Sequence, residues 1–266
     1  MKICVIIPMY GKEEYTRRCI EFVCKNAGFD HDILIVDDGS KVPFNIDRYK
    51  SDLFNLLRLE KNSGFTAACN AGIIWAQKFE YDYVLLLNND TEPERDFLKH
   101  LVDTIESDKT IGIAASVRRH KDRKFECMEL CGSDLIRGYQ YFADESKLPS
   151  SPIECNWIPL CSALIRMDMI REIGLLDKRM INHCSDTDYC FRAKINHWKV
   201  MLVPKSIVLH HLSVTVSSNN IVVDTDQKIM LEKLAGLDYQ KLMASMPLDG
   251  ESKTWGRLTF EVYRKD

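Results

Sequence analysis

Short apolar runs alternate with helical windows over the first 117 residues, and this alternation restricts the possible fold more than any other feature of the sequence. The runs with the length of strands are residues 2–8, 33–36, 55–59, 83–87 and 111–116. The windows with a helical spacing of apolar residues are residues 13–26, 66–79 and 96–107. Strands that alternate with helices predict an α/β fold whose central sheet is mostly parallel and has helices on both faces.

The first apolar run is continuous, which is typical of a strand buried on both faces of a sheet. Pro8 is expected to end this strand because proline has no N–H for the ladder. Gly28 is expected to stop the helix that follows.

The pattern becomes less regular after residue 116, and we expect the chain to fall into three parts. Residues 1–117 form a regular half, residues 118–215 form the second half of the same domain, and residues 216–266 form a helical C-terminal extension. The second half is predicted to contain a basic exposed stretch, antiparallel strands, a helix and two short strands, at residues 118–124, 125–142, 188–196, 200–203 and 207–209. The extension has its helical window at residues 222–245.

Charge and composition exclude several classes of protein. The 266 residues carry a net charge of −3, so no bulk positive field is present to hold phosphates, and nucleic acid is not an expected partner. The ten cysteines include no Cys-x-x-Cys pair and are expected to be reduced core residues. The longest apolar runs are too short to span a bilayer, and the N-terminus lacks a signal-peptide pattern. We therefore expect a cytoplasmic protein.

Polar side chains follow two of the predicted strands directly. Asp37-Asp38-Gly39-Ser40 follows one strand and Asn88-Asn89-Asp90 follows another. In open α/β sheets ligands bind outside the carboxyl ends of the strands, so both segments are candidate sites. The carboxylates of Asp37 and Asp38 can accept hydrogen bonds from a base or a sugar, and Asp90 suits Mg²⁺ or Mn²⁺. Both segments also have the composition of ordinary turns, and that interpretation stays open.

A run of small residues between these two segments is a third candidate. Residues 62–72 combine the turn Asn62-Ser63-Gly64 with a helix start rich in alanine and glycine. Small residues let the backbone come close to a ligand, and they equally let a helix pack tightly on a sheet.

Acidic and histidine residues in the second half complete the set of candidates. Asp188 and Arg192 are four residues apart and are expected to form a structural pair on one helix face. Asp186 is nearly opposite Asp188 on a helical wheel, so it is either a base in a cleft or a complement to the helix dipole. His210 and His211 follow a short strand, and either is a candidate metal ligand or a structural residue.

Taken in order, these segments resemble the inverting family 2 glycosyltransferases of GT-A fold. The matching segments are Ile6-Ile7-Pro8-Met9-Tyr10, Val36-Asp37-Asp38-Gly39-Ser40, Asn62-x-Gly64-Phe65-x-x-x-x-Asn70-x-Gly72, Leu87-Asn88-Asn89-Asp90, Ile173-Gly174-x-x-Asp177, Asp186-x-Asp188-x-x-x-Arg192 and His210. Each segment by itself is a weak indication of the family. The resemblance is specific because all seven segments occur in the family's order within residues 2–215. The Asn-Asn-Asp form is most similar to the rhamnosyltransferase-type branch.

The resemblance implies a role for each matching residue. The residues implied to bind the nucleotide-sugar are Pro8, Tyr10, Asp37, Asp38, Asn62, Gly64, Asn70, Asn88 and Asn89. Asp90 and His210 are implied to hold Mn²⁺ or Mg²⁺, with His211 a close rival of His210. Asp186 is implied to be the catalytic base. Trp157 and Ser185 match the region that lines the acceptor site, although a core position is an equal alternative for Trp157.

Two positions depart from the family pattern. Asn88 stands where the family has the first carboxylate of its Asp-x-Asp motif, and the lost charge is expected to weaken metal binding. Ser185 stands where the family has a glutamate before the catalytic aspartate. The departure at Ser185 is expected to affect the contacts with the acceptor more than the reaction itself.

The implied function is metal-dependent transfer of a sugar, with inversion, from a UDP- or dTDP-sugar to a hydroxyl of a glycan or lipid-linked glycan. Such an enzyme of polysaccharide biosynthesis would work in the cytoplasm or in peripheral contact with the inner face of the membrane. The alternative is a catalytically degenerate GT-A protein that binds a sugar or a partner. A dehydrogenase is excluded because no Gly-x-Gly-x-x-Gly follows the first strand, and a nucleotidyltransferase lacks its Gly-rich basic loop there.

Overall fold

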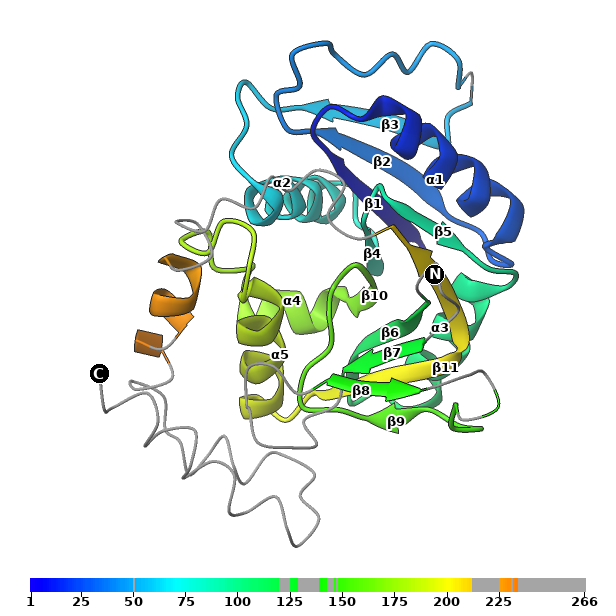
Figure 1. The fold of residues 1–266 in the computed structure, drawn as a ribbon, viewed down its shortest axis with the longest axis vertical. Coiled ribbons are helices and arrows are strands. Elements are labelled where there is room, and N and C mark those ends of the chain that lie inside the picture. The colour runs from blue at the N-terminus through cyan, green and yellow to red at the C-terminus, as the bar shows by residue number, and fades with distance from the viewer. Residues whose placement is uncertain are drawn as a thin grey trace, which may run out of the picture.

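The computed structural model describes residues 1–49, 51–119, 125–128, 139–142, 146, 148–211, 225–230 and 232–233. These residues form one mixed sheet with helices on both faces (Figure 1). Its strands are β1 (Ile3–Met9), β2 (Asp32–Asp37), β3 (Phe54–Arg58), β4 (Tyr83–Leu87), β5 (Thr91–Pro93), β6 (Ile111–Arg119), β7 (Phe125–Met128), β8 (Tyr139–Phe142), β9 (Ile153–Glu154), β10 (Ser162–Arg166) and β11 (Lys199–His210). The α-helices up to residue 195 are α1 (Glu13–Asn26), α2 (Phe65–Lys78), α3 (Phe97–Ser107), α4 (Met167–Ile173) and α5 (Ser185–Ile195).

The strand order along the sheet is β3-β2-β1-β4-β10-β6-β11-β5. The first four strands are parallel to one another, and so are β6 and β11. Strand β10 lies antiparallel between β4 and β6, and β5 lies antiparallel to β11. The carboxyl ends of β1, β2 and β4 therefore meet at one edge of the sheet, and β5 joins the end of β11 to that edge.

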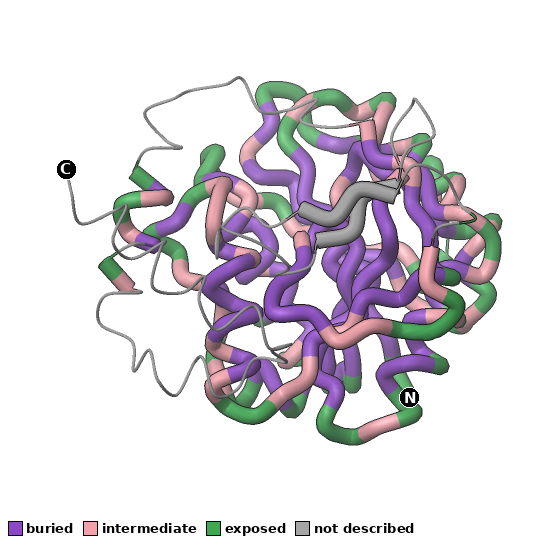
Figure 2. Tube along the Cα trace, turned by 60° about the horizontal axis from the view of Figure 1, so that its bottom comes forward, coloured by how far each residue is buried: buried purple, intermediate pink, exposed green. Residues whose placement is uncertain are grey.

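Side chains along the central strands point alternately to the two faces of the sheet, which explains how helices can cover both faces. On β1, Ile3, Val5 and Ile7 pack with apolar residues of α1 and α3, whereas Cys4 and Ile6 pack with residues of α2, α4 and α5. The central strands are buried along almost their whole length (Figure 2). At about 0.8 kcal/mol for each buried methylene group, this burial is the main stabilising contribution to the fold.

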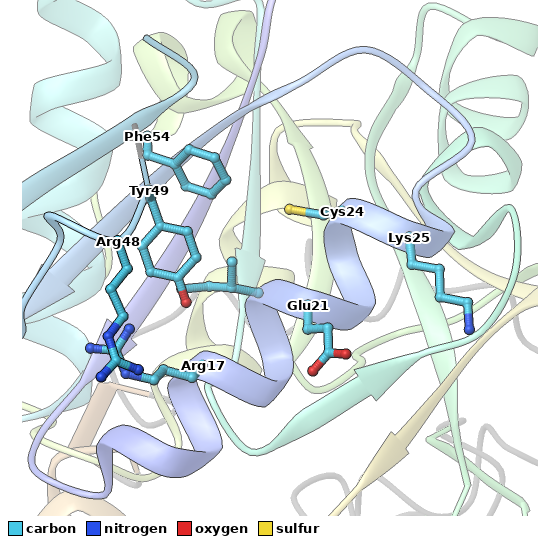
Figure 3. A pocket seen from close by; sticks show the side chains of 8 residues that line it. Arg17, Glu21, Cys24, Lys25, Arg48, Tyr49 and Phe54 are labelled. Atoms are coloured by element: carbon cyan, nitrogen blue, oxygen red, sulfur yellow. The ribbon is translucent and has the colours of Figure 1, made fainter. Parts of the chain in front are cut away.

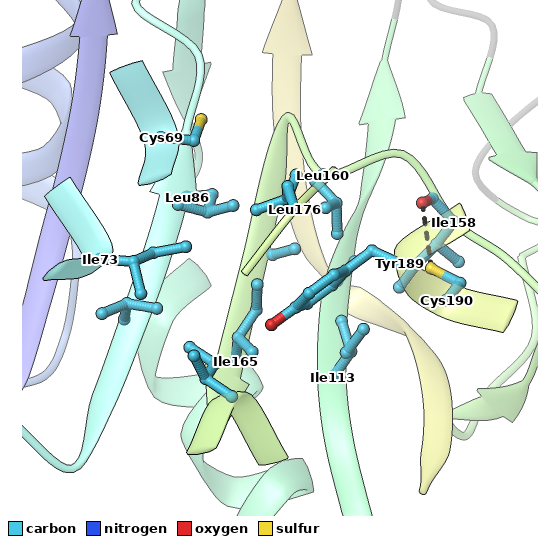
Figure 4. Close-up of a cluster of buried hydrophobic side chains, with 14 of the residues drawn as sticks. Cys69, Ile73, Leu86, Ile113, Ile158, Leu160, Ile165, Leu176, Tyr189 and Cys190 are labelled. Carbon is cyan, nitrogen blue, oxygen red and sulfur yellow. Dashed lines mark hydrogen bonds between the residues drawn. The ribbon is translucent and has the colours of Figure 1, made fainter. Parts of the chain in front are cut away.

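Helix α5 is anchored by two residues that lie in the core. Tyr189 is fully buried among apolar side chains of β6, β10 and the preceding loop (Figure 4). Its hydroxyl donates to the Gly174 carbonyl at 3.1 Å, and the Cys190 thiol donates to the Ile158 carbonyl at 3.6 Å. This packing sets the orientation of the first turn of the helix, which carries Asp186.

The expected α/β fold is confirmed, and several predicted elements match closely. Helix α1 has the predicted bounds, and β7 and β8 form an antiparallel pair within the window 125–142. The boundary proposed at residue 117 falls inside β6, so the two halves share one sheet. Of the window 222–245, residues 225–230, 232 and 233 are helical, and the rest lies outside the described residues.

Two predictions about strands are wrong, and one central strand was missed. Pro8 does not end β1, which continues to Met9. The Met9 carbonyl accepts from the Asp38 N–H on the side of β2, so the backbone of Pro8 faces the side of β4. Pairing with β4 has already ended at Ile6, so no N–H is needed from residue 8 on that side. The two short strands after residue 199 are one strand, β11, whose register with β6 shifts around Pro204 because proline cannot donate to the ladder. The central strand β10 was not predicted at all.

Arg118 also differs from its prediction. It lies on β6 and is buried rather than exposed, while residues 120–124 of the basic stretch lie outside the described residues. The cysteines of the described part are free thiols, and most of them are buried, as expected for core residues. No helix among the described residues is long and apolar enough to cross a bilayer.

Candidate functional site

The polar segments that follow β1, β2 and β4 lie at one edge of the sheet, because these strands are parallel and neighbours. Tyr10 directly follows β1 and is 37% exposed, whereas Pro8, two residues earlier, is buried. The Gly11 N–H donates to Ser40 Oγ at 2.8 Å, so the turn after β1 is tied to the turn after β2. The largely buried polar residues of the turn after β2 are therefore joined to the turn that holds the exposed Tyr10.

Asp90 and His210 are brought together at this edge by the pairing of β5 with β11. His210 is the register partner of Thr91, and its Nε2 lies 3.1 Å from Asp90 Oδ1. Asp90 is 4% exposed and His210 is 6% exposed. The amide nitrogen of Asn88 lies 3.4 Å from the same imidazole nitrogen. Two residues from one loop and one from a distant strand thus form a buried polar cluster.

Two polar atoms of this cluster have no hydrogen-bond partner within the described part of the chain. They are Asn88 Oδ1 and His210 Nδ1, and both are buried. A buried polar atom left without a partner costs about 1–3 kcal/mol, so the cluster is suited to a ligand or ion that satisfies it.

The donor set fits a divalent cation that substrate phosphates also ligate. Asp90 offers a carboxylate, His210 an imidazole and Asn88 an amide oxygen, and Mg²⁺ or Mn²⁺ is usually bound by one or two carboxylates plus phosphates. Among the described residues, no three His, Cys, Asp or Glu side chains gather into a metal-binding group. The protein alone therefore offers a partial coordination shell.

His211 belongs to a different cluster from His210. Its Nε2 lies 2.6 Å from Glu92 Oε1, and Arg18 Nε approaches the same carboxylate to 2.5 Å. Burial opposes ionisation of Glu92, but Arg18 and His211 outweigh it and lower the pKa of this carboxyl. Tyr15 contacts the His211 ring edge-on at 5.7 Å between centroids. The backbone N–H of His211 donates to the Asp90 carbonyl at 2.9 Å, but of the two rival imidazoles it is that of His210 that contacts the Asp90 carboxylate.

Asp37 is fully buried and shapes the turn after β2. It accepts from the backbone N–H groups of Ser40 at 2.9 Å and Phe44 at 3.2 Å, and it pairs with Arg58. Burial disfavours the charged form, yet the hydrogen bonds from Ser40 and Phe44 and the charge of Arg58 lower the pKa of Asp37. The carboxylate therefore has structural partners on both oxygens.

Asp38 holds the loop that leads into α2. Its two oxygens accept from the N–H groups of Ser63 at 2.9 Å and Gly64 at 2.8 Å. Asn62 is exposed, and its side-chain oxygen accepts from the same Gly64 N–H at 3.1 Å. Burial raises the pKa of Asp38 above its ordinary value. The predicted segments around Asp37 and Asn62 are thus joined by direct hydrogen bonds.

Gly64 lies at a point of close contact between two loops. Its φ is +91°, and a Cβ there would overlap Cγ2 of Ile181. Thr66 N–H donates to the Ile181 carbonyl at 3.1 Å, and Phe65 N–H donates to Asn182 Oδ1 at 3.1 Å. The loop before α5 therefore packs directly on the start of α2.

The side chains of Asn70 and Asn89 are both engaged by other parts of the fold. The Asn70 amide donates to the Leu176 carbonyl at 2.8 Å and accepts from the Leu176 N–H at 3.0 Å. The Asn89 amide donates to Thr16 Oγ1 on α1 at 3.0 Å. Their contact with a nucleotide stays a prediction. The observed hydrogen bonds connect Asn89 to α1 and Asn70 to the segment after α4.

Asp186 is the second residue of α5 and is partly exposed. Its Oδ1 accepts from the Thr187 N–H at 2.8 Å. Burial raises the pKa of Asp186, and the charges of Arg118 and His183 moderate that rise. A carboxylate with a raised pKa is a stronger base, as general base catalysis requires. Arg118 is the register partner of Val208, two residues before His210, so Asp186 lies within electrostatic reach of the strand that ends in the Asp90 cluster.

The other predicted residues of the second half are buried. Ser185 is 2% exposed, and Trp157 is 3% exposed within an apolar cluster, which matches the core alternative for its ring. Their acceptor roles stay predictions. The expected structural pair is confirmed, because Arg192 Nε donates to Asp188 Oδ2 at 2.9 Å.

Sequence reasoning missed Asp226 and Lys233, which contact the loop before α5 and α5 itself. Both lie in the helical window 222–245, but nothing in their local pattern distinguishes them from surface residues.

A groove elsewhere on the molecule holds none of the predicted site residues. It lies between α1 and the chain before β3 and is lined by Arg17, Ile20, Glu21, Cys24, Lys25, Arg48, Tyr49 and Phe54 (Figure 3). The guanidinium of Arg17 stacks on Phe44 at 4.8 Å and donates to the Asn45 carbonyl at 3.1 Å.

Comparison with solved structures identifies the fold. The chain superposes on S. aureus TarS 1–349 in complex with UDP-GlcNAc with a TM-score of 0.63 and 15% identity, over 99% of this chain and 72% of that one. It superposes on GalNAc-T7, solved with UDP, GalNAc and Mn²⁺, with a TM-score of 0.61 and 18% identity, over 79% of this chain and 44% of that one. The fold is therefore GT-A, as expected.

Comparison of sequences identifies the family. The chain is 30% identical over 107 residues to glycosyltransferase GlyA of Streptococcus pneumoniae, covering 39% of this chain and 15% of that protein. It is 21% identical over 236 residues to the uncharacterized glycosyltransferase YwdF of Bacillus subtilis, covering 88% of this chain and 83% of that protein. Residues 4–174 match the model for glycosyl transferase family 2. The chain spans only 15% of the length of GlyA, but the family model matches well over half of the chain, which therefore belongs to glycosyl transferase family 2.

Proposed function

We propose that this protein is a metal-dependent inverting glycosyltransferase that uses a UDP- or dTDP-sugar. The observation that carries the proposal is the buried cluster of Asp90, His210 and Asn88, with two unsatisfied polar atoms at the carboxyl edge of the sheet. The nucleotides of the two structural neighbours, UDP-GlcNAc on TarS and UDP on GalNAc-T7, support a nucleotide-sugar as the donor.

Asp90 and His210 would hold Mn²⁺ or Mg²⁺, with Asn88 beside them. A cation bound there supplies neutralisation of the charge that develops on the departing diphosphate. Tyr10 is proposed to contact the nucleotide, and its exposure at the end of β1 supports this role. Asp37 and Asp38 maintain the turns around it through the backbone hydrogen bonds described above.

Asp186 is proposed to act as the general base. Its Oδ1 accepts a hydrogen bond from the Thr187 N–H, so Oδ2 is the oxygen proposed to take the proton from the acceptor hydroxyl. The acceptor oxygen then forms a bond to the anomeric carbon as the bond from that carbon to the phosphate oxygen breaks. The nucleoside diphosphate leaves, and the configuration at the anomeric carbon inverts in this single in-line displacement.

The proposed acceptor is a hydroxyl of a glycan or lipid-linked glycan, in polysaccharide biosynthesis. The proposed location is the cytoplasm or the inner face of the membrane. The Asn-Asn-Asp form of residues 88–90 supports a relationship to the rhamnosyltransferase-type branch.

The alternative is a degenerate GT-A protein that binds a sugar or a partner without turnover. Asn88 and Ser185 favour it, since each lacks a carboxylate that the family pattern has. A panel of UDP- and dTDP-sugars with Mn²⁺ distinguishes the two. The proposal predicts release of the nucleoside diphosphate from at least one donor, whereas binding of a donor with no release, with or without glycan acceptors, supports the alternative.

A further inference from the structure

One carboxylate from the C-terminal segment accepts three consecutive backbone N–H groups. Asp226 is fully buried, and its Oδ1 accepts from Ile181 N–H at 2.9 Å. Its Oδ2 accepts from the N–H groups of Asn182 at 2.9 Å and His183 at 2.8 Å. Successive backbone N–H groups that converge on an anion form a concave site, and hydrogen bonds to a charged acceptor are stronger than neutral ones.

The loop that Asp226 holds leads directly into the first turn of α5. Cys184 follows with φ +60°, and Ser185 and Asp186 come next. On its other side this loop contacts the start of α2 through Thr66 and Phe65, as described above. The loop is therefore held between α2 and the segment that contains Asp226, which Figure 1 shows in orange beside it.

Lys233 of the same segment contacts α5 and the loop before it. Its Nζ lies 2.6 Å from Asp188 Oδ1 and 2.8 Å from Asp177 Oδ2. The Asp188 side chain is 3% exposed, and its second oxygen is taken by Arg192. A buried carboxylate requires such partners, because its charge is otherwise strongly unfavourable. Asp226 thus contacts the residues that precede Asp186, and Lys233 contacts Asp188, which follows it.

We propose that the helical residues 225–230 and 232–233 are a positioning element of the active site, in which Asp226 orients the turn that carries the base Asp186. This inference rests on the proposed function, since it takes Asp186 as the base. The segment lies beyond residues 4–174, which match the family model, so the positioning contact is supplied from outside that region. A shift of about 1 Å in a reacting group can cost on the order of 100-fold in rate, so such a contact affects turnover directly.

The test compares Asp226→Asn and Asp226→Ala with a matched control, Asp108→Ala. Asp108 also accepts from a backbone N–H, that of Thr110 at 2.8 Å, and pairs with Lys199, but it lies in the turn between α3 and β6, away from the carboxyl edge of β1, β2 and β4. Lys233→Met is a milder variant that retains the three N–H bonds of Asp226. Each variant is assayed for kcat and donor KM with the donor that the panel selects, for UDP binding with Mn²⁺, and for amide hydrogen exchange of residues 181–188.

We expect kcat to fall by about 10- to 100-fold in Asp226→Ala and by less in Asp226→Asn, which retains one acceptor oxygen. Donor KM and UDP affinity are expected to stay within about threefold, and exchange to accelerate over residues 181–188. Asp108→Ala is expected to alter stability without this change in kcat. Lys233→Met is expected to lower kcat several-fold.

Two outcomes overturn the inference. One is normal kcat with normal exchange over residues 181–188 in folded Asp226→Ala, and the other is an equal fall in kcat for Asp108→Ala. Asp186→Asn, assayed in parallel, separates the two proposals: if it turns over normally, the base assignment fails, whereas if it is inactive and the Asp226 variants are normal, only the positioning role fails. If no donor is turned over, unchanged exchange in the Asp226 variants still overturns the inference.

Discussion

His210 Nε2 lies 3.1 Å from Asp90 Oδ1, although 120 residues separate the two in the chain. The contact arises because the short strand β5, directly after Asp90, pairs antiparallel with the end of β11. The site is thus a consequence of how two distant segments share one edge of the sheet.

Replacement of Asp90 by alanine is expected to weaken Mn²⁺-dependent UDP binding by tenfold or more, about 1.4 kcal/mol, because it removes the carboxylate of the cluster. Asn88→Asp is the converse variant and is expected to tighten Mn²⁺ binding by adding a charge. Isothermal titration calorimetry with UDP, with and without Mn²⁺, measures both. Equal UDP affinity in the wild type and Asp90→Ala with Mn²⁺ would contradict the metal assignment.

His210→Ala and His211→Ala are expected to differ, since the two imidazoles contact different carboxylates. His210→Ala should reduce Mn²⁺ affinity, whereas His211→Ala should reduce stability slightly and leave Mn²⁺ affinity unchanged. Titration of Mn²⁺ in the presence of UDP, together with thermal melts, checks the pair. A larger loss of Mn²⁺ affinity in His211→Ala would reverse the assignment.

Two glycine substitutions are expected to separate backbone strain from a steric clash. Gly64 and Gly174 both have positive φ, but a Cβ at Gly64 meets Ile181 whereas a Cβ at Gly174 meets open space. Gly174→Ala should cost about 1 kcal/mol from strain, and Gly64→Ala should cost more and lower kcat by shifting the loop before α5. Urea unfolding and kinetics measure the two, and equal losses of stability would argue against the contact.

Asp37 is expected to make stability depend on pH in the acid range. Its folded pKa is lowered, so the stabilisation it contributes is present above the unfolded value of about 4 and is lost as the pH falls through the folded pKa. Asp37→Asn should cost about 1–3 kcal/mol at pH 7 and weaken the loss of stability below pH 4. Urea unfolding from pH 7 to pH 3 tests this, and parallel curves for the variant and the wild type would exclude the effect.

The regular half of the fold could be predicted because its signals are local. The bounds of α1 follow from apolar spacing, and β1, β2 and β4 are apolar runs that lie in the centre of the sheet. Strand β10 was missed because it is antiparallel to both of its neighbours, β4 and β6, and no predicted helical window lies between residues 116 and 162 to mark a crossover before it.

The site could be predicted in part, because some of its sequence signals are also local. Asp90 and Asp186 stand in local motifs, so the sequence could name them as candidates, but their partners depend on long-range contacts. Asn70 meets Leu176 across 106 residues, and Asp226 meets Ile181 across 45. No periodicity or turn signal encodes such contacts, which follow from the packing of α2 and the C-terminal segment on the loop before α5.

The central claim is that Asp186 removes the proton from the acceptor hydroxyl, and Asp186→Asn tests it most directly. The variant keeps the size of the side chain and an oxygen for the Thr187 N–H, but it cannot act as a base. Sugar transfer and UDP binding with Mn²⁺ are measured on the same preparation. We expect kcat to fall by about 10²- to 10⁴-fold with UDP affinity unchanged, whereas turnover within a few-fold of the wild type would exclude Asp186 as the base.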